Sequence, residues 1–97
     1  MSQDHRVEKL MSLTLTEFRA TIAPLAGGPL PPDRDCVELE VGGGTVAITY
    51  DPRPSVCLGG LLVMPRALVS LTFSNVGPTD QNVFLKRFDF VFQRGGG

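Results

Sequence analysis

Few side chains in this sequence could catalyse a reaction or bind a metal, and those few are far apart. The chain of 97 residues has one histidine, His5, and two cysteines, Cys36 and Cys57, which form no CxxC pair. A zinc site needs several convergent thiolate or imidazole ligands, and a nucleophilic cysteine needs a base held beside it. We therefore predict no catalytic residue, no metal site and no cofactor. Both thiols are expected to be reduced and to act as small buried apolar groups.

Two further patterns could indicate chemistry. Glu38 and Glu40 share one face of a predicted strand, and paired carboxylates can act as acid and base where burial separates their pKa values. The apolar residues lie on the other face of that strand, so we expect solvated carboxylates. Gly42–Gly44 could suggest a phosphate loop, but such a loop opens a helix. A β-branched strand follows these glycines, so we expect a hairpin turn.

The domain is expected to be organised around Val83–Gln93, VFLKRFDFVFQ. This stretch holds four of the six phenylalanines, all at even-numbered positions: Phe84, Phe88, Phe90 and Phe92. Alternate residues of an extended strand share one face. We therefore interpret the stretch as a strand with one aromatic face. Its opposite, mixed face would carry Arg87 and Asp89.

A helix is predicted at Leu15–Ala26, where apolar residues recur at helical spacing. Thr14 and Glu17, three residues apart, fit a capping box, in which each side chain bonds the other residue's backbone N–H. The following segment, Gly27–Asp35, contains three prolines and is interpreted as a stiff connector. The helix should therefore have a defined start and end.

Strands are predicted where apolar and polar residues alternate. Cys36–Val41 and Thr45–Tyr50 alternate on either side of the glycines and predict a hairpin. Residues 67–74 alternate again and predict another strand. Val56–Met64 is interrupted by two glycines and fits either a short edge strand or a loop. The elements together predict an α+β fold with an N-terminal helix packed on a four- to five-stranded antiparallel sheet.

One domain is expected, because a chain of this length is near the common domain size. We place it at residues 13–94, after a flexible N-terminal tail at 1–12 and before a flexible glycine tail at 95–97. The net charge of −1 gives no general attraction to nucleic acid or anionic lipid. The longest apolar run, at 56–64, is far shorter than the roughly 20 residues that span a bilayer, and the N-terminus has no apolar signal region. We expect a cytoplasmic protein without nucleic-acid or membrane partners.

With no reactive site in the sequence, we expect a non-catalytic interaction domain that forms a homodimer or binds another protein through a sheet edge or face. In such a homodimer, Arg87 and Asp89 could pair reciprocally across a twofold axis. An alternative is a small-molecule-binding domain with a pocket between helix and sheet, closed by the loop at Asp51–Met64. The polar anchors of that pocket would be Tyr50, Arg53 and Arg66.

Another alternative rests on the C-terminus, Gln93–Gly97, which ends in three glycines. This end resembles that of ubiquitin-like modifiers and sulfur carriers, which finish in a flexible diglycine. The resemblance is confined to these residues. The β-grasp fold of those proteins begins with a hairpin, whereas the helix is expected first here. The resemblance implies a carrier or modifier whose C-terminal carboxylate is activated by a partner enzyme.

Overall fold

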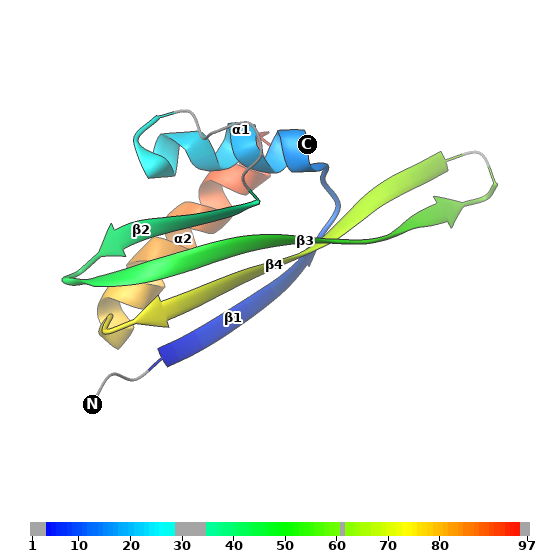
Figure 1. Ribbon diagram of the computed structural model, residues 1–97. Coiled ribbons are helices and arrows are strands. Elements are labelled where there is room, and N and C mark those ends of the chain that lie inside the picture. Colours follow the sequence, from blue (N-terminus) through cyan, green and yellow to red (C-terminus); the bar gives the residue numbers. More distant parts are fainter. Residues whose placement is uncertain (1–3, 29–34, 61, 96–97) are drawn as a thin grey trace.

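The computed structural model describes residues 4–28, 35–60 and 62–95, and these form an α+β domain (Figure 1). Its elements follow the order β1 (Asp4–Met11), α1 (Leu15–Ala26), β2 (Cys36–Val41), β3 (Gly44–Leu58), β4 (Leu62–Ser74) and α2 (Pro78–Gly95). The four strands form one antiparallel sheet in the order β1-β4-β3-β2. The predicted α+β class and antiparallel sheet are confirmed. The sheet has four strands, and a strand precedes the first helix.

Helix α1 begins and ends where the sequence predicts, because local interactions define both ends. The Glu17 backbone N–H donates to the Thr14 hydroxyl at 3.1 Å, and the Thr14 N–H donates to the Glu17 carboxylate at 2.8 Å. The capping box is therefore present. At the other end Gly27 adopts a left-handed conformation with φ of 80°, which glycine adopts at no steric cost.

The β2–β3 hairpin also forms as predicted. Val41 pairs with Gly44 in the ladder, and the two residues between them, Gly42 and Gly43, have φ of 53° and 83°. Positive φ at both central residues is the geometry of the two-residue turn that matches the twist of a hairpin. The glycine run is thus a turn that continues into a strand, and it does not open a helix.

The predicted aromatic strand is wrong, because Val83–Gln93 lies within helix α2. Phe84, Phe88 and Phe92 are four residues apart, so successive helical turns place them on one face. These three rings are 7%, 0% and 6% exposed, whereas Phe90 is 58% exposed. A strand would have buried all four phenylalanines together, and the helix buries only three of them.

Strand β1 lies in the segment that was expected to be a flexible tail. It pairs with β4 along its whole length, from Asp4 opposite Ser74 to Met11 opposite Ala67. Its side chains are mostly exposed, and Val7 and Met11 are only partly buried against the core. An edge strand that carries charges on both faces shows little apolar alternation, which is why the pattern does not reveal it.

The described residues of the segment Val56–Met64 form the far end of a long hairpin. Pairing of β3 with β2 stops at Thr49, and pairing of β4 with β1 stops at Ala67. The Tyr50 N–H still donates to the Asp35 carbonyl oxygen at 2.7 Å; beyond it, the described residues of β3 and β4 form a two-stranded ladder with a register shift between Arg53 and Val56. We call residues 53–58 and 62–66 the arm, and Figure 1 shows it projecting from the body of the domain.

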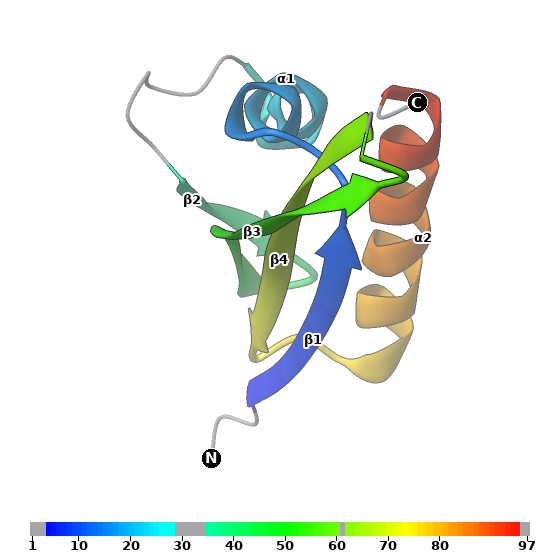
Figure 2. The ribbon, with the colours of Figure 1, turned by 90° about the vertical axis from the view of Figure 1, so that its right-hand side faces the viewer.

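Both helices pack on the same face of the sheet, and the core lies between them and the two central strands (Figure 2). Phe18 of α1 contacts Tyr50 of β3 with ring centroids 5.4 Å apart, and Phe73 of β4 contacts Phe84 of α2 at 5.9 Å. The most deeply buried side chains are Phe18, Phe73, Phe88, Leu13, Ile22, Ile48, Leu71, Val46 and Val69. Within the described ranges, no helix is long and apolar enough to cross a bilayer.

Candidate functional site

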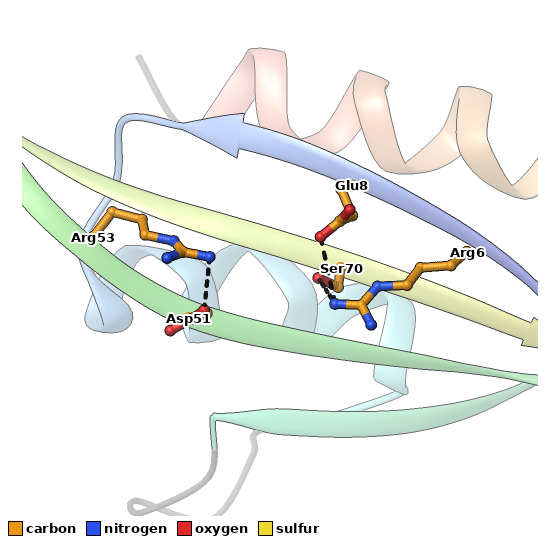
Figure 3. Close-up of polar contacts among 5 residues, drawn as sticks. All are labelled: Arg6, Glu8, Asp51, Arg53 and Ser70. Atoms are coloured by element: carbon orange, nitrogen blue, oxygen red, sulfur yellow. Dashed lines mark hydrogen bonds and ion pairs between the residues drawn. The ribbon is translucent and has the colours of Figure 1, made fainter.

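The sheet face opposite the helices is a candidate surface, and we call it the open face. No described helix lies on it, and Figure 3 views it with both helices behind the strands. Alternation along β3 and β4 places small residues at its centre: Thr45, Ala47, Thr49, Ser70, Thr72 and Ser74. The outer strands add charged residues, which are Asp4, Arg6 and Glu8 on β1 and Glu38 and Glu40 on β2.

The polar contacts on the open face centre on Arg6. Its guanidinium donates to the Ser70 hydroxyl at 3.2 Å and to the Glu8 carboxylate at 3.4 Å (Figure 3). A second ion pair, between Arg53 and Asp51, spans 3.2 Å. A shallow hollow of about 430 Å³ lies between these pairs, lined by Arg6, Asp35, Thr49, Asp51, Ser70 and Thr72 among others. The described residues that line the hollow offer hydroxyls and charges, and none of them is a nucleophile with an adjacent base.

Among the described residues, the two outer strands of the sheet each have one unpaired backbone edge. There, β1 pairs with β4 alone and β2 pairs with β3 alone. An unpaired edge presents N–H and C=O groups that can bind another strand. The sheet can therefore be extended at either side.

The arm is exposed and apolar. Leu62 and Val63 are 54% and 61% exposed, although both are large hydrophobic residues. Its own backbone edges are poor templates for pairing, because Pro54 and Pro65 lack N–H donors. The arm therefore presents side chains more readily than it accepts a further strand.

Tyr50, predicted as a polar anchor of a ligand pocket, is engaged inside the domain. Its side chain is 7% exposed, and its hydroxyl donates to the Leu13 carbonyl oxygen at 3.1 Å. Burial raises the pKa of the phenol, and the nearby negative charge of Glu17 raises this pKa further. Tyr50 thus connects β3 to the residues that lead into α1.

The other predicted anchors, Arg53 and Arg66, are brought together by the fold. They are opposite each other in the β3–β4 ladder at the base of the arm, and alternation places both on the side of the open face. Tyr50 points to the opposite face of β3, toward the helices. The loop expected at Asp51–Met64 to close a pocket between helix and sheet is not found there, because the described residues of this range continue β3 and β4 into the arm.

Arg87 and Asp89 lie on helix α2, so their predicted place on a second sheet face is wrong. The error follows from the strand assignment of the aromatic stretch. Asp89 forms an ion pair of 3.0 Å with Lys9 of β1. Arg87 lines a shallow groove of about 280 Å³ between the helices, together with Pro24, Leu25, Lys86, Phe90 and Val91. The two residues do not form a common site.

The cysteines are free, as predicted, but both are exposed. Cys36 is the first residue of the edge strand β2, where the Thr49 hydroxyl donates to its sulfur at 3.6 Å. Cys57 lies in the arm. The expectation of buried thiols is wrong, because both residues lie on strands outside the core. No group of three or more potential metal ligands gathers within the described part of the chain.

Sequence reasoning missed the Arg6–Glu8 pair because residues 1–12 were interpreted as a tail. The signal that could have identified β1 is the order Asp4, Arg6, Glu8, which alternates in sign at every second residue. Comparison of the chain with protein-family models, curated proteins and solved structures finds no match.

Proposed function

We propose that this chain is a non-catalytic interaction domain that forms a homodimer through its sheet. The observation that supports this most directly is the layered arrangement itself. Both helices cover one face of the sheet, which leaves the open face and both edges uncovered among the described residues. Twofold pairing is the commonest way for a soluble protein to cover such a surface.

The chemistry of the open face also favours an interaction role. Its centre consists of small hydroxyl residues and one alanine, and its charged groups are partly engaged with each other, as in the Arg6–Glu8 and Asp51–Arg53 pairs. A general base or nucleophile requires a partner that holds and activates it. No pair of this kind is found on the described open face.

Light scattering after size exclusion tests the proposal. At micromolar concentration, the parent protein is expected to have about twice the mass of one chain. Dilution should shift the mass toward that of one chain, because non-obligate association follows mass action. A protein that remains monomeric up to high micromolar concentration would contradict the proposal.

We propose small-molecule binding as a second candidate function, favoured by the hollow on the open face. Arg6 supplies a cation there, Asp35 and Asp51 supply carboxylates, and Thr49 and Thr72 supply hydroxyls. This lining suits a small polar ligand that carries both an amine and a carboxylate. A panel of small molecules of this kind, tested by thermal shift, is the direct experiment. A ligand of this site should raise the melting temperature of the parent, and Thr72→Val should reduce that rise. A panel without any such shift removes this candidate.

A further inference from the structure

We infer that two copies of the chain pair through β1, antiparallel, with Val7 of each copy on the twofold axis. This inference rests on the proposed homodimer and names its interface. No strand of the described ranges pairs with the outer edge of β1, so a second β1 can continue the ladder. The result is a continuous eight-stranded sheet. In this register even-numbered residues lie opposite even-numbered residues, and odd-numbered residues lie opposite odd-numbered ones. The helices of both copies therefore lie on the same side of the joint sheet, and the two open faces form one continuous surface.

The charge order of β1 is self-complementary in this register. Arg6 of one copy lies opposite Glu8 of the second copy, and Glu8 lies opposite Arg6, so two ion pairs form by symmetry. Directly opposite residues in an antiparallel ladder have Cβ atoms about 4.5–5.5 Å apart, close enough for such pairs. On the face toward the helices, Val7 meets its symmetry mate.

The two neighbouring registers that also place even-numbered residues opposite each other have their axis at Arg6 or at Glu8, and both are less favourable. An axis at Arg6 places the two Arg6 side chains opposite each other and Asp4 opposite Glu8. An axis at Glu8 places the two Glu8 side chains together. Like charges directly opposite each other destabilise a strand pair. The axis at Val7 therefore combines full overlap of residues 4–10 with opposite charges at its centre.

The remaining pairs in this register carry no uncompensated repulsion. His5 lies opposite Lys9, whose ammonium group is already 3.0 Å from the Asp89 carboxylate. Asp4 lies opposite Leu10, which is 59% exposed in the single chain. Pairing would reduce that exposure, because the partner strand lies beside Leu10.

The other edge of the sheet is unsuited to the same contact. Strand β2 carries Glu38 and Glu40 on the open face. An antiparallel pair of β2 strands centred on Leu39 would place Glu38 opposite Glu40 twice, and a pair centred on either glutamate would oppose identical charges. Charged residues of one sign are a common protection of edge strands against pairing. Of the two edges, only β1 is complementary to itself.

The Arg6 and Glu8 side chains are available for such an exchange. They form an ion pair of 3.4 Å within one strand, with 61% and 49% of their side chains exposed. Exposed pairs of this kind contribute little stability. Little stability is therefore lost when Arg6 and Glu8 leave each other and pair with Glu8 and Arg6 of the second copy. The charges then set the register, while backbone hydrogen bonds and the burial of Val7 and Leu10 supply affinity.

A charge-swap series tests this interface by light scattering. Arg6→Glu and Glu8→Arg should each shift the protein from dimer to monomer, because each places like charges opposite each other at two symmetric positions. The double variant R6E/E8R restores opposite charges and should restore the dimer. Arg53→Glu is the matched control, since Arg53 is on the same side of the sheet but outside β1. It should leave the dimer intact.

Cross-linking gives an independent measurement that does not depend on charge. In a background with Cys36→Ser and Cys57→Ser, Val7→Cys should form a covalent dimer on mild oxidation, because the axis brings the two thiols together. Leu10→Cys is the control and should cross-link weakly, because it lies opposite Asp4. Circular dichroism establishes that each variant is folded. If a charge variant unfolds, the cross-linking result decides.

The outcomes separate this inference from the proposed function. A dimeric parent whose mass is unchanged by both single swaps, with no cross-link from Val7→Cys, contradicts pairing through β1 but leaves a homodimer with another interface. A double swap that stays monomeric while folded also contradicts the register. A parent that is monomeric at every concentration contradicts both the interface and the homodimer.

Discussion

The Tyr50 hydroxyl donates a hydrogen bond to the Leu13 carbonyl oxygen at 3.1 Å, across 37 positions of the chain. Tyr50 is in the middle of β3, and Leu13 lies between β1 and α1. The tyrosine ring also contacts Phe18 of α1, with centroids 5.4 Å apart. One side chain thus attaches the start of α1 to the central sheet.

This contact predicts how the domain responds to alkaline pH. Burial and the charge of Glu17 raise the pKa of Tyr50 above its ordinary value, which is about 10. The folded state therefore holds the phenolic proton more tightly than the unfolded state. The resulting stability is fully present below the ordinary value and is lost as pH rises through the raised pKa.

Tyr50 is the only tyrosine, and the chain has no tryptophan, so the ultraviolet absorbance of tyrosinate reports this one group. We expect its ionisation in the native protein at higher pH than in the protein denatured by urea. Tyr50→Phe, which lacks the ionising group, should remove that part of the alkaline loss of stability. Equal titration midpoints in the native and denatured chains would show that the phenol is not buried.

Truncation of α2 side chains should distinguish its buried face from its exposed face. Phe88 is fully buried, and its ring centroid lies 4.4 Å from that of Phe92. Phe88→Ala should cost about 3–5 kcal/mol in the free energy of unfolding. Phe90→Ala, at a largely exposed position of the same helix, should cost about 1 kcal/mol or less. Urea denaturation of both variants measures the difference, and similar costs would favour a strand over the helix.

Glycine at position 44 should be required for close packing. A Cβ atom there would clash with the backbone oxygens of Ser74 and Asn75, so Gly44→Ala should cost about 1–3 kcal/mol. Gly77 is the control, because a Cβ atom there would meet nothing within 4 Å. Gly77→Ala should be neutral or slightly stabilising. Thermal melts of the two variants test the contact, and an unchanged Gly44→Ala melt would refute it.

The two thiols should be reactive in the folded protein. Cys36 and Cys57 are both free and exposed, so iodoacetamide should modify them in native buffer nearly as fast as in denaturant. Mass spectrometry over time measures both rates. The double serine variant should remain within about 0.5 kcal/mol of the parent, as for other surface changes. Slow modification of either thiol under native conditions would mean that a contact covers it.

The arm should contribute little to the stability of the domain. Val63 is 61% exposed, whereas Val69 on the same strand is fully buried. Val63→Ser should change the free energy of unfolding by no more than about 0.5 kcal/mol, and Val69→Ser should cost about 2–5 kcal/mol. If β1 forms the dimer interface, Val63→Ser also leaves the dimer intact. A large loss of stability from Val63→Ser would place the arm against the core.

The elements that can be predicted from the sequence are those that local interactions define. Helix α1 follows from its capping box at Thr14 and Glu17 and from Gly27 at its end. The β2–β3 hairpin follows from alternation on both sides of a glycine turn. In each case, the residues that specify the element are neighbours in the chain, so short-range spacing contains the necessary information.

Tertiary structure alone decided the aromatic stretch and the N-terminal strand. Phe84, Phe88 and Phe92 are spaced four residues apart. This spacing is twice the two-residue period of a strand and close to the 3.6-residue period of a helix, so it fits both structures. The core determines the outcome, because α2 buries these three rings against the sheet and α1, while Phe90 remains largely exposed. β1 is similar, because its backbone hydrogen bonds depend on β4, whose paired residues are 56 to 70 positions away in the chain. The alternating charges of Asp4, Arg6 and Glu8 are compatible with a strand, but they do not indicate which strand it pairs with.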